Sequence, residues 1–122
     1  MRITEHFSSE ELACRCGCGY DAINPYLVHR LQVIRDLAGL PITIVSGVRC
    51  KEHNKAVGGT ENSYHLEGQA CDWTFGGDEG SLERSIMIDF CERRLVRWSG
   101  GFHYYRDKNF CHTDIGPMRR WK

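Results

Sequence analysis

The sequence predicts an α+β domain in which a small antiparallel sheet is flanked by helices. Segments with helix caps and apolar residues at helical spacing alternate with short runs rich in β-branched or aromatic residues. The chain has 122 residues, 41% of them hydrophobic, which suits one domain with a single modest core. We therefore expect residues 1–122 to form one domain that acts as a monomer.

The first part of the chain contains two helix start signals. Ser8 and Glu11 have the spacing of a capping box, which predicts a short helix. Asn24 followed by Pro25 opens a longer helix that Gly39 ends. The apolar face of this longer helix consists of Leu27, Leu31, Ile34 and Ala38. We expect it to be core scaffold.

A strand and two further helical segments follow. Residues 42–45 are mostly β-branched, which is typical of a strand, and Arg49 projects from the exit of that strand. A helical turn is expected at 51–57. Ser81 can cap a longer helix that runs to about Val96. The apolar face expected for this helix consists of Leu82, Ile86, Phe90 and Leu95.

The segment after residue 101 alternates apolar and polar residues around a polar turn at 106–109, which predicts a hairpin. With this loop length, His103 lies directly opposite His112, with Cβ atoms about 5 Å apart. Asp114 follows His112 by two residues, so it points to the same face. A slip of one residue would move His103 to the other face.

Two short segments offer three metal ligands. His65 and Asp72 lie close in sequence, and His112 follows in the hairpin. A strand is expected at 72–75, and the glycines at 58–59 allow a tight loop that brings His65 to the metal. Structural zinc usually has four protein ligands, whereas three leave room for a water whose pKa falls to roughly 7. We therefore predict a hydrolytic zinc site.

The pattern S-x-H-x-x-G-x-A-x-D that begins at Ser63, with H-x-D from His112, resembles the D-Ala-D-Ala carboxypeptidase and L-alanyl-D-glutamate endolysin family of zinc peptidases. Further matches lie at residues 7–12, 14–19, 46–49, 53–54, 57–59 and 120–121. The resemblance implies a hedgehog/D,D-peptidase-like fold. It also implies a zinc metallopeptidase that hydrolyses stem peptides or crosslinks of bacterial peptidoglycan. Whether the enzyme is an endopeptidase or a carboxypeptidase stays open.

Amide hydrolysis also needs a general base. The resembling family commonly has a carboxylate three residues before the final histidine, but Asn109 occupies that position here. His103 and Asp114 are the first candidates, with Asp107 in reserve. The alternative for Asp114 is to orient an imidazole, and the alternative for His103 is an ordinary cross-strand histidine.

Arg49 and Ser63 are the expected substrate contacts. The guanidinium of an arginine can donate two hydrogen bonds to a carboxylate or bind a polarised carbonyl. The resemblance implies that the equivalent arginine lines the site. An ordinary surface arginine is the alternative. Ser63 is a small polar residue beside the candidate ligands.

The chain has seven cysteines, and an odd number cannot all pair within one molecule. A scaffold built only from disulfides is therefore disfavoured. Cys14, Cys16 and Cys18 alternate with other residues, and Cys50 with His53 has the C-x-x-H spacing of a zinc half-site. A second, structural zinc ion and a disulfide of the Cys18–Cys50 type are both open alternatives.

Charge and hydropathy bear on the partners and the location. Sixteen basic residues balance sixteen acidic ones, so no overall field favours nucleic acid or a membrane surface. Residues 1–6 lack the apolar core of a signal peptide, and no run reaches the ~20 apolar residues of a membrane span. We expect the protein to be cytoplasmic as synthesised and to act on the cell wall after release, as a phage or prophage endolysin does.

Two other functions compete with the hydrolase. A non-catalytic zinc-bearing binding module of the same fold is the main alternative, and Asn109 is its best support. A nucleic-acid-binding zinc module based on the N-terminal cysteines is more distant, because no basic stripe accompanies them.

Overall fold

The computed structural model describes residues 1–76, 81–94, 101–115 and 119–120. Its helices are α1 (Ser9–Leu12), α2 (Pro25–Ala38), α3 (Lys51–Ala56), the 3-10 helix η1 (Tyr64–Glu67) and α4 (Leu82–Arg94). Its strands are β1 (Ile42–Ser46), β2 (Ala70–Phe75), β3 (Gly101–Tyr105), β4 (Phe110–Asp114) and β5 (Arg119–Arg120). Within these ranges no helix has the length and apolar character needed to span a bilayer.

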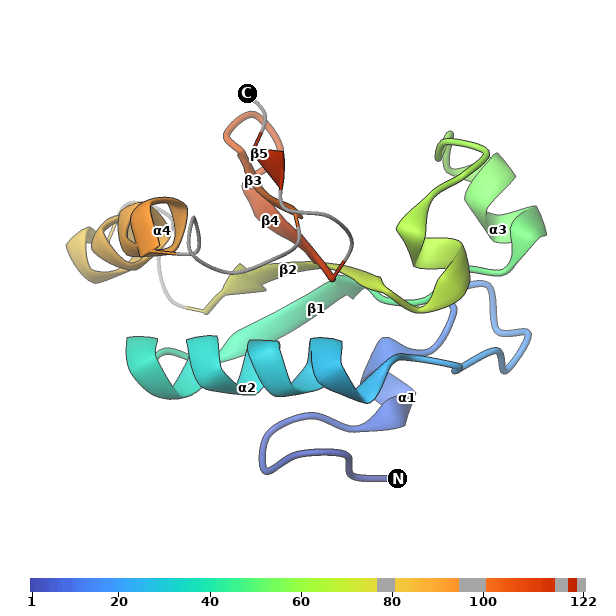
Figure 1. The fold of residues 1–122 in the computed structure, drawn as a ribbon, viewed down its shortest axis with the longest axis horizontal. Helices are drawn as coiled ribbons and strands as arrows, with labels where there is room; N and C mark the ends of the chain where they lie inside the picture. The colour runs from blue at the N-terminus through green and yellow to red at the C-terminus, as the bar shows by residue number, and fades with distance from the viewer. Residues whose placement is uncertain (77–80, 95–100, 116–118, 121–122) are drawn as a thin grey trace.

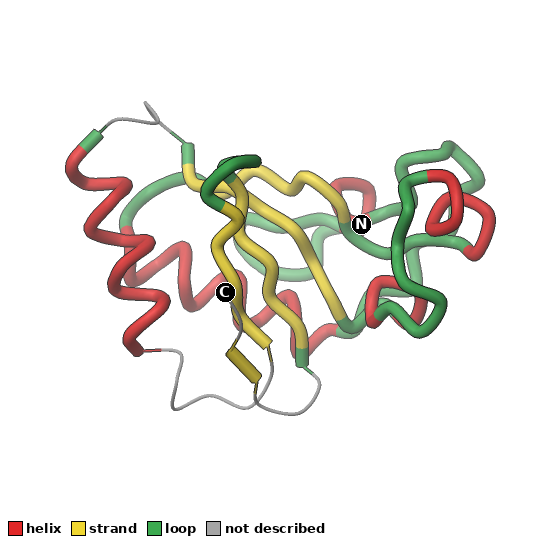
Figure 2. Tube along the Cα trace, turned by 90° about the horizontal axis from the view of Figure 1, so that it is seen from above, coloured by secondary structure: helices red, strands yellow, loops and turns green. Residues whose placement is uncertain are grey.

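The strands form one sheet in the order β1-β2-β4-β3-β5. β1 to β4 pair antiparallel, and the short β5 pairs parallel with β3. Helix α2 runs below the sheet, whereas α4 and α3 lie at opposite ends of the molecule (Figure 1). Seen from above, the hairpin strands β3 and β4 extend from the middle of the fold (Figure 2). The predicted α+β class with an antiparallel sheet and flanking helices is confirmed.

The pleat of the sheet separates an apolar face from a polar face. Alternate residues of β2, Cys71, Trp73 and Phe75, are buried in the core cluster, and Cys111 of β4 joins them. The helical part of the same cluster includes Phe7, Leu12, Leu27, Val28, Leu31, Ile34, Ile88 and Cys91. The intervening residues of β2 and β4 therefore point to the other face, and these include Asp72.

The helix caps lie where the sequence predicts them. The side-chain oxygen of Ser8 accepts the Glu11 amide at 3.4 Å, and the Glu11 carboxylate accepts the Ser8 amide at 3.1 Å. Asn24 Oδ1 accepts the amide of Tyr26 at 2.9 Å. Helix α2 ends at Gly39, whose φ of 67° lies in the left-handed region that favours glycine.

The apolar face predicted for α4 is wrong. The solvent-exposed fractions of three residues assigned to it are 72%, 49% and 36%, for Leu82, Ile86 and Phe90. Ile88 and Cys91 enter the core instead. Leu95 and Val96, which the sequence places at the end of this helix, lie outside the described residues, as does Trp121 of the sequence motifs.

A buried arginine explains the rotation of α4. Arg84 is almost fully buried, and its guanidinium donates to the carbonyl of Phe75 at 3.3 Å and to the hydroxyl of Thr74 at 2.6 Å. Arg84, Ile88 and Cys91 are spaced by four and three residues, so they share one face of the helix. The hydrogen bonds of Arg84 to β2 therefore turn this face toward the sheet.

The hairpin has the predicted register. Tyr105 pairs with Phe110 and His103 pairs with His112 across β3 and β4. The turn ends at Asn109, whose φ of 58° is in the left-handed region that asparagine tolerates better than most residues. The predicted juxtaposition of the two histidines is confirmed at the level of strand pairing.

We expect Gly47→Ala to destabilise the fold by about 1–3 kcal/mol, because overpacking against a fixed backbone costs this much. An added Cβ would lie 2.2 Å from the carbonyl oxygen of Leu12. That oxygen accepts the Val48 amide at 2.9 Å, so it cannot easily move. Denaturant unfolding would measure the change in the free energy of unfolding.

Gly76→Ala is the matched control, since its added Cβ would come no closer than 3.3 Å, to the Pro41 side chain. This variant should lose less stability than Gly47→Ala, because the Pro41 side chain need shift by only a few tenths of an ångström. Equal stability of the two variants would show that the strand exit is not tightly packed.

Candidate active site

The polar face of the sheet holds a row of three site residues on neighbouring strands. Asp72 of β2 pairs with His112 of β4, and His112 pairs with His103 of β3. His65 belongs to η1, which contacts β2. The sequence predicts a loop for His65, whereas the structure has a short 3-10 helix there. Three of the site residues are thus fixed by strand register and one by a helical turn.

The candidate metal ligands converge. His65, Asp72 and His112 each offer one ligand atom, and these atoms lie within 4.8 Å of one another. Asp72 Oδ1 is 2.9 Å from His112 Nδ1 and 3.4 Å from His65 Nε2. All three side chains are largely buried. The structure therefore brings together the whole ligand set that the sequence predicts.

The ring of His65 is oriented by backbone groups. Its Nδ1 lies 2.7 Å from the carbonyl oxygen of Gly47. A carbonyl only accepts, so Nδ1 carries the hydrogen and Nε2 keeps a lone pair that faces Asp72. Ser63 caps η1 by accepting the amide of His65 at 3.1 Å. This capping gives Ser63 a structural role, and its contact with substrate stays a prediction.

The ring of His112 is held between two carboxylates. Its Nε2 lies 2.8 Å from Asp114 Oδ2, and its Nδ1 faces Asp72. Asp114 is 1% exposed, and its Oδ1 accepts the amide of Gly101 at 2.9 Å. These contacts favour the orienting role of Asp114 over the role of general base. An Nε2–H bond to Asp114 leaves the Nδ1 lone pair available to a metal.

The charges of the site depend on one another. Although burial alone raises the pKa of the Asp72 carboxyl, the neighbouring imidazoles of His112 and His65 lower it well below its usual range. Burial alone lowers the pKa of His112, but Asp114 and Asp72 raise it above its usual value. In the metal-free protein His112 thus tends to hold a second proton. A metal that binds here displaces that proton, so binding weakens as the pH falls.

The donor set fits a zinc ion. Two imidazole nitrogens with fixed tautomers and one ionised carboxylate are ligand types that zinc prefers. The acceptors behind the rings, Gly47 and Asp114, are the kind of outer partners that metal-bound histidines have. His65, Asp72 and His112 are therefore the residues that would hold the metal.

Arg49 lines the site beside the ligands. Its Nη2 lies 3.4 Å from Asp72 Oδ2, the oxygen that faces away from His112. Its Nε donates to the hydroxyl of Ser46 at 3.3 Å. A bulge in β1 between Ile44 and Ser46 shifts the pairing so that Ser46 lies opposite Asp72. The structure thus places Arg49 beside Asp72, where it can orient this candidate ligand, and its contact with substrate stays a prediction.

Sequence reasoning assigned no role to Asn54 and Gly59, which support Arg49. Asn54 Oδ1 accepts from Arg49 Nη1 at 3.1 Å, and Asn54 Nδ2 donates to the carbonyl of Thr60 at 2.8 Å. A Cβ on Gly59 would lie 2.1 Å from Asn54 Oδ1. The sequence motifs at 53–54 and 57–59 contain these residues, namely the amide side chain of Asn54 and the second glycine of a pair. They were the available signal for the two supporting roles.

The candidate bases differ in their surroundings. His103 is half-buried and shares the face of His112, and its ring contacts that of Tyr105 with a centroid distance of 4.5 Å. Asp107 is exposed on the hairpin turn. Asn109 accepts from the hydroxyl of Tyr104 at 2.9 Å. Of the two first candidates, His103 lies on β3 opposite His112, whereas Asp114 is bonded to His112 itself.

Residues 5–114 match the family model described as Peptidase M15, and every candidate site residue lies within that range. The peptidoglycan L,D-endopeptidase MepK of Escherichia coli (strain K12) is 31% identical over 107 residues, which cover 82% of this chain and 55% of the relative. The probable peptidoglycan L,D-endopeptidase MepK of Haemophilus influenzae is 30% identical over 99 residues, 77% of this chain and 50% of the relative. The chain spans about half the length of these relatives.

Asp114→Asn should weaken zinc binding by roughly 10- to 100-fold, the usual effect of removing an outer partner. The new amide oxygen can still accept the Gly101 amide, so the amide NH₂ would face His112 Nε2. Two N–H groups cannot bond, and His112 would move its proton to Nδ1, the nitrogen needed for the metal. Competition with a chromophoric chelator measures the affinity.

His65→Ala and His112→Ala remove ligands and should abolish high-affinity zinc binding in the same assay. Asp107→Asn changes an exposed carboxylate of the turn and is the matched control, with unchanged affinity expected. Wild-type affinity in Asp114→Asn would contradict the orienting role.

Proposed function

Because the chain belongs to the peptidase M15 family, whose peptidases are zinc-dependent, we propose that it is a zinc metallopeptidase that hydrolyses peptide bonds in bacterial peptidoglycan. The observation that carries the proposal is the convergence of His65, Asp72 and His112 with their outer partners in place. Three protein ligands leave a coordination position for the reaction, whereas a structural zinc site is closed.

The residues around the ligands have distinct tasks in this proposal. Zinc supplies a Lewis acid that polarises a carbonyl and activates water. Arg49 keeps its positive charge at the edge of the site with 13% of its side chain exposed, so it can bind a substrate carbonyl or carboxylate. Asp114 holds the tautomer of His112, and Arg49 also holds Asp72.

Proton transfer is assigned to His103. The group that takes a proton from water must lie near the ligands and must be able to accept and release a proton. Asp114 is already bonded to Gly101 and His112, and Asn109 has no basic oxygen at neutral pH. His103 lies directly opposite His112 on the same face of the hairpin. An imidazole can both accept and donate a proton, which suits both steps of proton transfer.

The substrate is proposed from the relatives. Both are named peptidoglycan L,D-endopeptidases, so we propose endopeptidase action on a bond between an L- and a D-amino acid of the wall peptide. A carboxypeptidase that releases one terminal residue is the less favoured form. A non-catalytic zinc-bearing module is the second candidate function, because Asn109 stands where the resembling family commonly has a carboxylate.

The zinc-loaded protein should cleave purified muropeptides, lose the activity with chelator and regain it with zinc. Mass spectrometry of the products reads the bond that is cut, since a carboxypeptidase frees a single amino acid and an endopeptidase frees a longer fragment. His112→Ala, which lacks a ligand, is the control for a contaminating hydrolase. Intact muropeptides after a day with fully metallated protein would favour the binding module.

His103→Ala should retain zinc but lower turnover by about 10²-fold or more, the usual contribution of general acid–base catalysis. Steady-state cleavage of a labelled stem peptide measures kcat, and its pH profile should lose one limb in the variant. Asp107→Asn is expected to have a far smaller effect. An inactive Asp107→Asn with a near-normal His103→Ala would show that the turn, not the strand, carries the base.

A further inference from the structure

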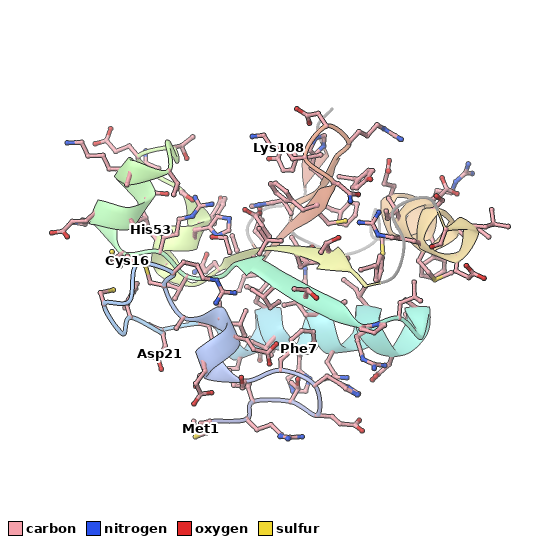
Figure 3. All side chains as sticks on the ribbon, turned by 180° about the vertical axis from the view of Figure 1, so that it is seen from behind. Met1, Phe7, Cys16, Asp21, His53 and Lys108 are labelled. Carbon is pink, nitrogen blue, oxygen red and sulfur yellow. The ribbon has the colours of Figure 1, made fainter. Side chains whose placement is uncertain are left out.

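A second cluster of metal-binding side chains lies away from the candidate active site. We propose that Cys14, Cys16, Cys18 and Cys50 bind one zinc ion in a closed, structural site. The first three cysteines lie between α1 and α2, and Cys50 caps the N-terminus of α3. Figure 3 labels Cys16 at the end of the molecule that carries His53 of α3, well away from the hairpin tip at Lys108. This inference does not rest on the proposed function.

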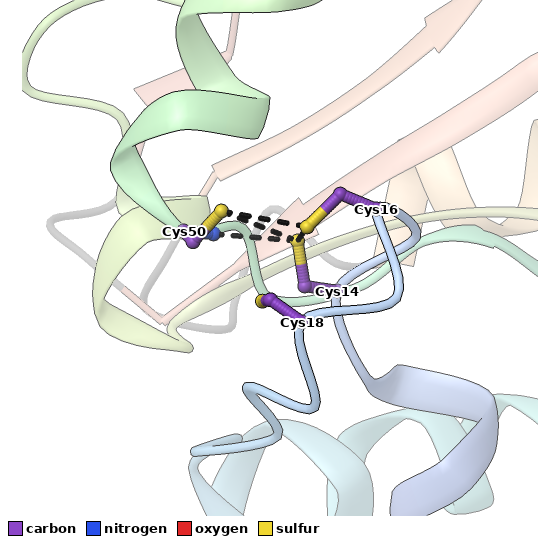
Figure 4. A group of neighbouring side chains, drawn as sticks. All are labelled: Cys14, Cys16, Cys18 and Cys50. Atoms are coloured by element: carbon purple, nitrogen blue, oxygen red, sulfur yellow. Dashed lines mark hydrogen bonds between the residues drawn. The ribbon is translucent and has the colours of Figure 1, made fainter.

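The sulfur positions fit a shared ion. The four sulfurs lie within 4.8 Å of one another, and Figure 4 shows the contacts that join Cys14, Cys16 and Cys50, with Cys18 beside them. Cys14 Sγ is 3.4 Å from Cys16 Sγ and 3.8 Å from Cys50 Sγ, and the latter two are 3.6 Å apart. Tetrahedral zinc with Zn–S bonds of about 2.3 Å places its sulfurs about 3.8 Å apart.

A disulfide fits these positions less well. A disulfide bond brings two sulfurs to about 2.05 Å, and all four cysteines are free. One disulfide, such as the Cys18–Cys50 alternative, would also leave two thiols of the same cluster unused. Four thiols that converge are the donor set of a closed zinc site.

The backbone of the cysteine segment is folded to make this convergence. In an extended strand Cys14 and Cys18 would be about 13 Å apart. Gly17 and Gly19 instead have φ values of 84° and 85°, in the left-handed region that favours glycine. The amide of Cys14 donates to the carbonyl of Tyr20 at 2.8 Å and closes the loop. The two glycines thus bring the three sulfurs close to one another, with Cys14 buried and Cys16 and Cys18 exposed.

Backbone amides point at two of the sulfurs. The amide of Cys50 lies 3.4 Å from Cys14 Sγ, and the amide of His53 lies 3.4 Å from Cys50 Sγ. Such N–H donors stabilise thiolate, which is the form that binds metal. His53 contributes its amide, and its ring is not in the group of converging ligand atoms. Cys18, and not His53, therefore completes the proposed group of four ligands, and the C-x-x-H half-site stays an interpretation of the sequence.

The position of the site suggests what the ion does. Cys50 directly follows Arg49, whose amide donates to the carbonyl of His65 at 2.9 Å. Arg15 lies between two of the cysteines and donates to the carbonyl of Ile44 in β1 at 3.0 Å. An ion bound by the cysteines would therefore connect the N-terminal loop to the segment around Arg49 and Cys50. This segment contacts the backbone of His65 through the Arg49 amide.

The test is zinc content per chain of the full-length protein, measured by elemental analysis after removal of loosely bound metal. The parent should hold two zinc ions. A variant with His65→Ala and His112→Ala should hold one, and a variant with Cys16→Ser and Cys18→Ser should also hold one. Cys91→Ala, a buried cysteine of α4, is the control and should keep both.

Cobalt identifies which site remains occupied. The cobalt-loaded His65→Ala, His112→Ala variant should show intense sulfur-to-cobalt charge-transfer bands and the visible bands of tetrahedral cobalt. The Cys16→Ser, Cys18→Ser variant should lack the charge-transfer bands. If the cysteine variant fails to fold, the histidine variant is titrated with a mercurial reagent instead. The proposal predicts that one zinc ion is released as four thiols react.

Three results would overturn the proposal. The first is a folded histidine variant that contains no metal. The second is a disulfide among Cys14, Cys16, Cys18 and Cys50. It would lower the intact mass of the parent by two hydrogens relative to the reduced chain, and peptide analysis would map the loss to these cysteines. The third is iron in place of zinc in protein prepared with both metals present.

Discussion

The approach of Asp72 to His112 across β2 and β4, with 2.9 Å between Oδ1 and Nδ1, is the contact on which the candidate active site depends. It exists because the two residues are paired in the sheet and point to its polar face. That choice of face is set by Trp73 and Cys111 on the opposite face, where both are buried in the hydrophobic core. A slip of one residue would expose a tryptophan and bury a carboxylate, so hydrophobic burial fixes the register of the site.

The hydrogen-bond acceptors behind the two imidazoles determine which ring nitrogen of each histidine can bind a metal. The Gly47 carbonyl and the Asp114 carboxylate each take one ring hydrogen, so His65 presents Nε2 and His112 presents Nδ1 to the same space. Arg49 balances the charge of Asp72 from the other side. The ligands are thus oriented before a metal binds, which reduces the cost of ordering them when it does.

The residues that local patterns determine could be predicted from the sequence. The loop length of the hairpin sets the pairing of His103 with His112, and the capping residues set the ends of α2. Features that depend on distant contacts could not be predicted. The rotation of α4 follows from hydrogen bonds of Arg84 to β2, and the position of Ser46 follows from a bulge that leaves no pattern in β1. The roles of Asn54 and Gly59 require the position of Arg49 in space.

The central claim is that the outer acceptors fix the tautomers of the two histidine ligands. A two-bond ¹H–¹⁵N correlation spectrum of the zinc-loaded, ¹⁵N-labelled protein tests it most directly, because protonated, metal-bound and free imidazole nitrogens have different shifts. We predict that His65 carries its hydrogen on Nδ1 and His112 on Nε2, with the metal on the other nitrogen of each ring. The reverse tautomer at either residue would contradict the account.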